Sequence, residues 1–201
     1  MRKALLHLKK SDPILAEIIL RVGPYKLRQD VPDFRSVVRA IVYQQLHGKA
    51  AATIFSRLLA LTGAPITPQG ILKLSIDQMR GAGLSKQKLS YLRDLAERTQ
   101  RGELNFERML EMTDEEVIAE LTQVKGIGVW TAHMFLMFAL KRPNVLPVGD
   151  LGIQSAIKKH YKKRKLLKPK QMEKIAKCWE PYRSVACWYL WRSLDVKPPE
   201  A

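Results

Sequence analysis

Residues 121–153 read LTQVKGIGVWTAHMFLMFALKRPNVLPVGDLGI, and this stretch decides the fold. Gly126 and Gly128 stand two residues apart, a spacing that lets the backbone turn sharply and brings N–H groups close to a phosphate at the start of the next helix. The apolar run that follows predicts a helix over residues 130–140. On their own, the two glycines are also compatible with an ordinary tight turn between helices.

The loop after this helix leads to an aspartate. Residues 141–149 are rich in proline and glycine, and Asp150 then stands directly before an expected helix over residues 151–160. Aspartate is a preferred residue at such a position because its carboxylate accepts a hydrogen bond from the first turn of the helix. The local sequence therefore predicts that Asp150 is a helix cap.

The rest of the chain is also predicted to be helical. Apolar residues recur at helical spacing over residues 34–45, and Thr113 with Glu116 forms the pattern of a capping box. No stretch shows sustained strand alternation or an internal repeat, so we predict an all-α protein. The further expected helices span residues 13–22 and 49–61, short segments capped by Thr67 and Ser75, a segment after Ser85, and residues 113–121, 169–178 and 182–193.

The charge indicates a polyanionic partner. The 201 residues include 35 Lys and Arg against 19 Asp and Glu, a formal net charge of +16, while a hydrophobic content of 46% excludes a disordered basic tail. No apolar run is long enough to predict a membrane span or a secretory signal. Residues 158–170, with Lys86 and Lys88, are candidates for phosphate contacts, although a basic segment can also be a solvated surface.

Cysteine and histidine usage argues against a bound metal. Two cysteines, Cys178 and Cys187, cannot build a disulfide framework, a four-thiolate zinc site or a four-cysteine iron–sulfur cluster. The four histidines are scattered along the chain. We therefore expect no metal site and a reducing compartment: the cytoplasm or nucleoid of a prokaryote, or the nucleus of a eukaryote.

Several segments together resemble one family. KGIGVWTA (125–132) followed by PVGD (147–150) is similar to the helix-hairpin-helix and Gly/Pro-Asp signature of the DNA glycosylase superfamily. IVYQQLHGKAA (41–51) resembles the helix end that carries the DNA-invading residue in that superfamily. GAGLSKQKLSYLRDLA (81–96) and WEPYRSVACWYLW (179–191) resemble its alkylated-base branch, the 3-methyladenine DNA glycosylase II family. The resemblance covers most of residues 34–193.

The resemblance implies the architecture and also shows departures. It implies a two-lobed helical fold, with residues 1–201 as a single catalytic domain, interleaved lobes and a helix-hairpin-helix at about 113–140. No four cysteines follow the catalytic segment, so we expect no iron–sulfur cluster. The segment before Phe34 is too short for an N-terminal β lobe. Trp130 stands where the bifunctional branch carries its Schiff-base lysine, so we expect no lyase activity.

The resemblance also implies roles for single residues. Asp150 would be the catalytic carboxylate, stabilising positive charge on the sugar and orienting the attacking water. Trp130, Trp191 and Tyr189 would line the base pocket, where aromatic rings attract a cationic base. Leu46 would fill the hole left by the flipped base, His47 would lie in the minor groove, and Leu84 would be a second wedge. The remaining expected DNA contacts are Lys125, Gly126, Gly128 and Thr131.

These residues together predict a monofunctional DNA glycosylase. It would act as a monomer on double-stranded DNA with damaged bases, flip out alkylated purines of the 3-methyladenine and 7-methylguanine type, hydrolyse the N-glycosidic bond and leave an abasic site. We expect no cofactor, and the sequence leaves open whether the hairpin carbonyls hold a monovalent cation. The alternatives are a glycosylase for oxidised or deaminated bases and a non-catalytic helix-hairpin-helix module. An RNA-binding protein is disfavoured because no RNP-type aromatic pattern is present.

Overall fold

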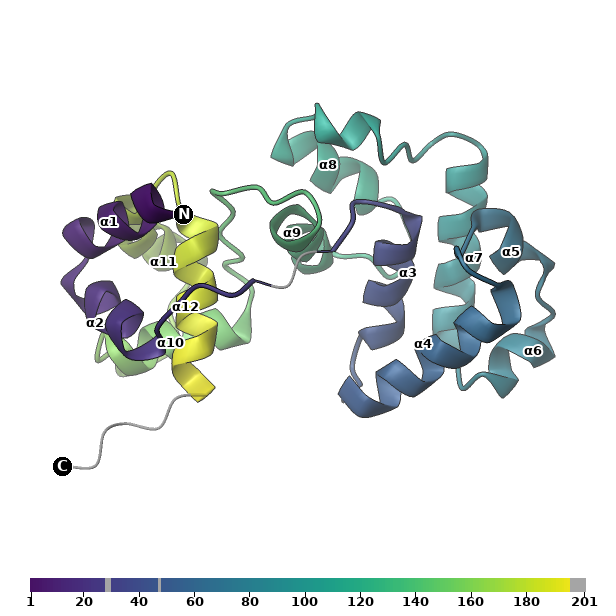
Figure 1. Cartoon of the computed structure of the whole chain (residues 1–201), viewed down its shortest axis with the longest axis horizontal. Helices are drawn as coiled ribbons and strands as arrows, with labels where there is room; N and C mark the ends of the chain where they lie inside the picture. Colours follow the sequence, from purple (N-terminus) through teal and green to yellow (C-terminus); the bar gives the residue numbers. More distant parts are fainter. Residues whose placement is uncertain (28–29, 47, 196–201) are drawn as a thin grey trace. The chain divides into compact units, whose positions relative to one another are not determined.

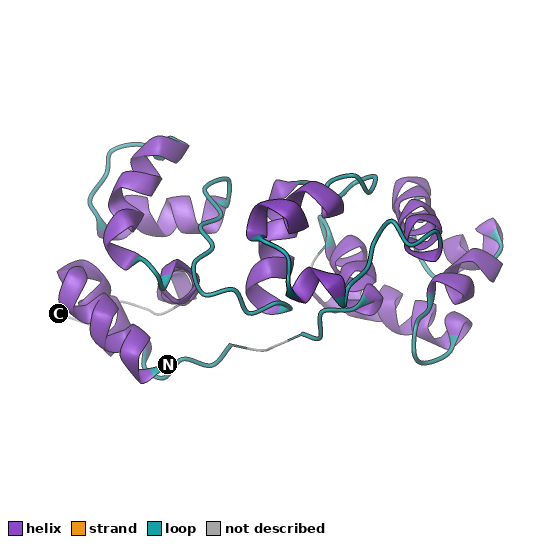
Figure 2. Ribbon diagram, turned by 90° about the horizontal axis from the view of Figure 1, so that it is seen from above, coloured by secondary structure: helices purple, strands orange, loops and turns teal. Residues whose placement is uncertain are grey.

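Every regular element in residues 1–27, 30–46 and 48–195, the part of the chain that the computed structural model describes, is helical (Figure 2). The all-α prediction is therefore confirmed. The chain forms two compact units, one from Met1–Gln29 with Lys141–Ala201 and the other from Asp30–Leu140. Both ends of the chain thus belong to the first unit, and the second unit is inserted between them. No helix among the described residues is long and apolar enough to cross a membrane.

The first unit is built around its last helix (Figure 1). That helix packs against one helix from the N-terminal segment and one from the C-terminal segment, which ties the two segments together. Its sequence is buried almost continuously from Ser184 to Leu190. The helices of this unit are α1 (Arg2–Ser11), α2 (Pro13–Val22), α10 (Leu151–His160), α11 (Pro169–Ala176), the short η2 (Lys177–Trp179) and α12 (Arg183–Asp195).

The second unit places the glycine hairpin between two of its helices. The elements are α3 (Phe34–Tyr43), α4 (Gly48–Thr62), α5 (Pro68–Lys73), α6 (Ile76–Gly81), α7 (Lys86–Gln100), η1 (Arg108–Leu110), α8 (Asp114–Leu121) and α9 (Val129–Phe138). α7 packs against α3 and α5, while α9 packs against α8 and α3. The hairpin that joins α8 to α9 therefore lies close to both α3 and α7.

Several helices begin at the capping residues that the sequence predicts. The Thr113–Glu116 capping box is present, and α10 begins and ends where it was predicted. The predicted helix over 34–45 ends earlier, at Tyr43, because Gln44 leaves the helical conformation with ψ of 132°, and Gln45 then takes a left-handed conformation with φ of 54°. α1 was not predicted, since its buried stripe consists of only Ala4 and Leu8 among mostly polar residues.

A buried aspartate joins distant parts of the first unit. Asp12 is 5% exposed and caps α2 by accepting a hydrogen bond from the Leu15 N–H at 3.1 Å. Its Oδ2 atom also accepts hydrogen bonds from the Tyr161 hydroxyl and, at 2.7 Å, from the Trp179 Nε1–H. Burial and the bond to Asp12 both raise the pKa of Tyr161, so the phenol remains a donor. One carboxylate thus connects α2 with the end of α10 and with η2.

Replacing this aspartate should destabilise the first unit. We expect Asp12→Ala to lower the free energy of unfolding by about 2–4 kcal/mol, because it removes a helix cap and leaves buried donors without an acceptor. Asp33→Ala is the matched control, since Asp33 caps α3 through one backbone bond from Ser36 at 2.8 Å; the expected loss is about 1 kcal/mol. Urea unfolding measures both. Equal losses in the two variants would contradict the role given to Asp12.

Candidate functional site

The glycine hairpin of the second unit requires glycine at one of its two positions. Gly126 has φ of 77°, and a Cβ atom there would lie 2.1 Å from a carbon of the Tyr91 ring. Gly128 has an ordinary φ of −97°, caps α9, and has open space where its Cβ atom would be. Gly126 therefore sets the shape of the turn, whereas Gly128 leaves the start of α9 exposed and without a side-chain cap.

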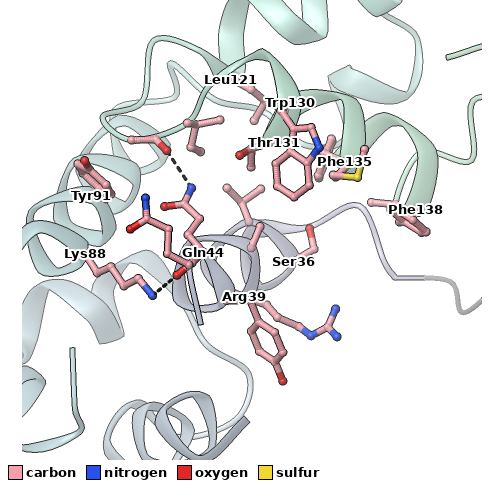
Figure 3. A pocket seen from close by; sticks show the side chains of 18 of the residues that line it. Ser36, Arg39, Gln44, Lys88, Tyr91, Leu121, Trp130, Thr131, Phe135 and Phe138 are labelled. Atoms are coloured by element: carbon pink, nitrogen blue, oxygen red, sulfur yellow. Dashed lines mark hydrogen bonds between the residues drawn. The ribbon is translucent and has the colours of Figure 1, made fainter. Parts of the chain in front are cut away.

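Side chains from two other helices hold the hairpin backbone in place. The Asp94 carboxylate on α7 accepts a hydrogen bond from the Lys125 N–H at 2.9 Å, and the Lys125 Nζ lies 3.9 Å from the same carboxylate. The Gln44 Nε2 atom, at the end of α3, donates to the Gly126 carbonyl at 2.9 Å (Figure 3). The Lys125 side chain is still 68% exposed, so its predicted phosphate contact stays a prediction.

A lysine organises the turn after α3. The Lys88 Nζ atom donates to the Gln44 carbonyl at 2.7 Å (Figure 3). It also donates to the Val42 carbonyl at 2.7 Å, and so caps the C-terminal end of α3. Burial lowers the pKa of Lys88. Beyond this turn Leu46 is 40% exposed, which suits its expected role as a wedge, while His47 lies outside the described residues. The ammonium group of Lys88, a candidate phosphate contact, is thus used inside the protein.

A cavity of about 590 Å³ lies within the second unit, between α3, α7, the hairpin and α9 (Figure 3). Trp130, in the first turn of α9, lines this cavity and is 47% exposed, whereas Thr131 lines it as a buried residue. An ion pair of 2.9 Å joins Arg39 to Asp30 at the cavity, which balances the charge of both groups. The other aromatic residues that line the cavity are Tyr43, Tyr91, Phe135 and Phe138.

Asp150 occupies a well-defined position in the first unit. It is 8% exposed and caps α10, and its Oδ1 atom accepts hydrogen bonds from the Ile153 N–H at 2.7 Å and the Trp191 Nε1–H at 2.8 Å. Gly152 makes this arrangement possible, because a Cβ atom there would lie 2.9 Å from the Trp191 Cδ1 atom and 3.0 Å from Asp150 Oδ1. The predicted cap is confirmed, and the carboxylate is held in one orientation by donors from two helices.

The surroundings of Asp150 offer no competing nucleophile from cysteine. Cys187 on α12 is fully buried, and burial together with the negative charge of Asp150 raises the pKa of its thiol. A thiol in such a setting stays protonated and is a poor nucleophile. Among the described residues no group of three His, Cys, Asp or Glu side chains is arranged to hold a metal ion.

Burial corrects two of the expected site residues. Leu84 is only 3% exposed, packed in the turn between α6 and α7, so it is not an exposed wedge. Tyr189 is fully buried, and its hydroxyl donates to the Gly23 carbonyl at 3.0 Å, so it is a core residue of the first unit rather than a pocket residue. In both cases the side chain faces the packed side of its element, which a match of residue types along the sequence does not reveal.

Two residues that support the hairpin could not be recognised from the sequence. Asp94 was not singled out because it precedes Lys125 by 31 residues, and no local pattern links them. Gln44 stands two residues before the predicted wedge Leu46, but its bond to Gly126 spans 82 residues. A helical projection does not single out Asp94, because it is one of several charged residues on α7 and lies four residues before Arg98, with which it pairs.

A glycine hairpin between two helices and a buried aspartate that begins another helix define an all-helical protein of the helix-hairpin-helix class. The family described as "HhH-GPD superfamily base excision DNA repair protein" matches residues 38–181. This match covers well over half of the chain, and the chain belongs to the HhH-GPD superfamily.

Similar proteins include characterised members of one branch. DNA-3-methyladenine glycosylase 1 of Schizosaccharomyces pombe is 33% identical over 199 residues, covering 96% of this chain and 87% of the relative. The structure of the 3-methyladenine DNA glycosylase of that yeast in complex with abasic DNA has a TM-score of 0.84 at 34% identity, covering 94% of this chain and 95% of that chain. DNA-3-methyladenine glycosidase of Bacillus halodurans has a TM-score of 0.83 at 38% identity, covering 94% and 87%. The resemblance to the alkylated-base branch is therefore confirmed.

The two hairpin glycines should differ in their tolerance of a methyl group. We expect Gly126→Ala to cost about 2 kcal/mol or more in the free energy of unfolding, because alanine would be strained at this φ and would overlap the Tyr91 ring. Gly128→Ala, the control, should cost about 1 kcal/mol or less. Urea unfolding and titration with duplex DNA measure the two variants. A Gly126→Ala protein as stable as the Gly128→Ala protein would contradict the packing described.

Proposed function

We propose that this chain is a monofunctional DNA glycosylase that hydrolyses the N-glycosidic bond of alkylated purines in double-stranded DNA and leaves an abasic site. Membership of the HhH-GPD superfamily and the names of the relatives support this proposal. The single structural observation that carries it is the Asp150 carboxylate, which donors from α10 and α12 fix in orientation. A group held in this way is prepared to act on charge that develops in a transition state.

The proposed reaction needs one carboxylate and one water molecule. The bond between C1′ of the deoxyribose and the base nitrogen breaks, and its electron pair leaves with the base. Water forms the new C1′–O bond and gives up a proton to Asp150 or to the solvent, while the carboxylate stabilises the positive charge on the sugar. A methylated purine that is already cationic leaves as a neutral molecule, so no second acid is needed.

Aromatic side chains support the choice of an electron-poor base. Trp130 presents an exposed indole at the cavity of the second unit, and a ring face attracts a cation by about 0.5–2 kcal/mol, depending on desolvation. The cavity of about 590 Å³ is within the range of small-molecule sites. Trp130 also lacks the amine that an imine intermediate requires, so we propose hydrolysis without lyase chemistry.

The proposal further places the protein on duplex DNA as a monomer without a cofactor. The chemistry above draws on Asp150, water and the charge of the damaged base. The compartment would be the one that holds the DNA, the nucleoid or the nucleus.

Asp150→Asn should separate catalysis from binding. Asparagine keeps the helix cap but removes the negative charge, so we expect release of methylpurines to slow by at least about 100-fold while affinity for duplex DNA stays unchanged. The measurement is single-turnover release from methylated duplex DNA, with the products resolved by chromatography. Asp33→Asn, which alters the cap of α3 in the same way, is the control and should keep the parental rate.

The same reactions contain the results that would contradict the proposal. Normal release by Asp150→Asn would rule out its catalytic role, and no release of any methylpurine by the parental chain would overturn the function itself. Borohydride added to the parental reaction should trap no covalent adduct with DNA. An adduct would show that a lysine of this chain forms an imine.

The two indole–carboxylate pairs of the first unit should respond differently to loss of the indole N–H. Trp191→Phe removes the 2.8 Å bond to Asp150, and we expect the single-turnover rate to fall about tenfold because the carboxylate is less well oriented. Trp179→Phe removes the 2.7 Å bond to Asp12 and should lower stability without changing this rate. Equal effects of both variants on the rate at saturating enzyme would contradict a positioning role for Trp191.

A further inference from the structure

The positive charge of the chain is concentrated in one unit. Residues 1–27 and 141–195, in the first unit, carry 20 Lys and Arg against 6 Asp and Glu, a formal net charge of +14. Residues 30–140, in the second unit, carry 13 against 12, a net charge of +1. The unit that contains the glycine hairpin is thus nearly neutral. The attraction for a polyanion that the total charge predicts must come mainly from the first unit.

Ion pairs leave these net charges unchanged, but they occupy several of the cations of the second unit. In the second unit, several arginines are neutralised by neighbouring carboxylates: Arg39 by Asp30, Arg98 by Asp94 and Glu103, Arg101 by Glu103, and Arg108 by Glu120. Exposed pairs of this kind contribute little to stability but reduce the field that a distant phosphate experiences. The positive charge of the first unit is carried mainly by lysines.

Three of these lysines form a stripe on α11 and its continuation. Lys170, Lys174 and Lys177 follow one another at spacings of four and three residues, so they share one face of the helix, and all three are exposed. Met172 and Ala176 are fully buried on the opposite face. The stripe extends over about 10 Å of helix axis, a length over which one DNA strand presents about three phosphates.

Two lysines of α1 lie beside the end of this stripe. The His7 Nε2 atom is 3.1 Å from the Cys178 carbonyl oxygen, next to Lys177 in the chain, and α1 packs against η2. Lys3 and Lys10 are four residues before and three residues after His7, on the side of α1 that borders this contact. We define the lysine face as Lys3, Lys10, Lys170, Lys174 and Lys177.

Nearby carboxylates do not neutralise the lysine face. Within the described residues no ion pair involves any of its five members. Glu173 is exposed on α11 at helical spacing from Lys170 and Lys177, so this one carboxylate lowers the net charge of the stripe, although it forms no ion pair with either lysine. Of the neighbouring acids, Asp12 is buried and hydrogen-bonded, and Glu180 pairs with Arg183 at 3.2 Å. The five ammonium groups are therefore available to an external anion.

We propose that the lysine face is a second DNA-binding surface, which contacts the phosphate backbone and supplies a large part of the salt-dependent affinity for DNA. It belongs to the first unit, whereas the hairpin belongs to the second. The choice of duplex DNA as the polyanion rests on the proposed function; the existence of a polyanion-binding surface rests on the charge distribution. Lysine suits this role because it contacts phosphates as a point charge without reading sequence.

The test compares two triple variants that remove the same amount of charge. The lysine-face variant combines Lys170→Gln, Lys174→Gln and Lys177→Gln. The control variant combines Arg57→Gln, Lys73→Gln and Arg80→Gln, which replace three exposed residues of the second unit. Affinity for an undamaged 20-base-pair duplex is measured by fluorescence anisotropy between about 50 and 200 mM salt. Each lost phosphate contact reduces the magnitude of the slope of log K against log salt by about 0.9. We therefore expect the magnitude of this slope to fall by about 2–3 in the lysine-face variant and by less than about 0.5 in the control variant.

Each further result bears on the proposal. The proposal would be overturned if the lysine-face variant kept the parental slope, or if the slope fell equally in the control variant. It would also be overturned if the lysine-face variant lost affinity for single-stranded RNA but not for the duplex. Circular dichroism and thermal unfolding check that both variants remain folded. A changed slope without any methylpurine release by the parental chain would support the surface and contradict the proposed function, so the two failures can be told apart.

Discussion

The hydrogen bond from the Trp191 indole to Asp150 is the contact on which the candidate active site depends. The carboxylate oxygen that begins α10 is the same atom that receives the indole N–H from α12, and Gly152 leaves just enough room for the ring. The carboxylate that stabilises the start of α10 is therefore the same group that the proposed chemistry needs. A helix cap tolerates several residue types, but a cap that must also orient a carboxylate beside an indole tolerates very few.

The unit that holds Asp150 repeats this arrangement once for purely structural purposes. Asp12 begins α2 and accepts the Trp179 indole N–H, with the Tyr161 hydroxyl as a further donor. Asp12 accepts three hydrogen bonds, is only 5% exposed and ties together three parts of the chain, which is a structural role. The comparison shows why a buried aspartate with an indole partner is not by itself evidence of catalysis. The catalytic role of Asp150 is therefore a proposal, which draws on the membership of the chain in the HhH-GPD superfamily as well as on this geometry.

Much of the fold could be predicted from the sequence because its signals are local. The caps at Thr113 and Asp150 act over three residues, and they determine where α8 and α10 begin. Contacts over long distances in the chain could not be predicted: Gln44 reaches the hairpin across 82 residues. The burial of the Leu84 side chain could not be predicted either, which is why this residue was expected to be a wedge. Its segment matched the family in residue types, and residue types do not report on which side of a turn a leucine packs.

The separation of charge between the units is consistent with two physically different ways of holding DNA. A glycine hairpin and an uncapped helix start offer backbone N–H groups and a helix dipole, which act at short range and need no net charge. A face of exposed lysines acts over about a Debye length, roughly 8–10 Å, and weakens as salt rises. A neutral hairpin unit can form close contacts without binding every phosphate strongly, while the basic unit keeps the protein near the duplex. Placing the whole net charge of +16 around the hairpin would tighten non-specific contacts with DNA at the hairpin itself.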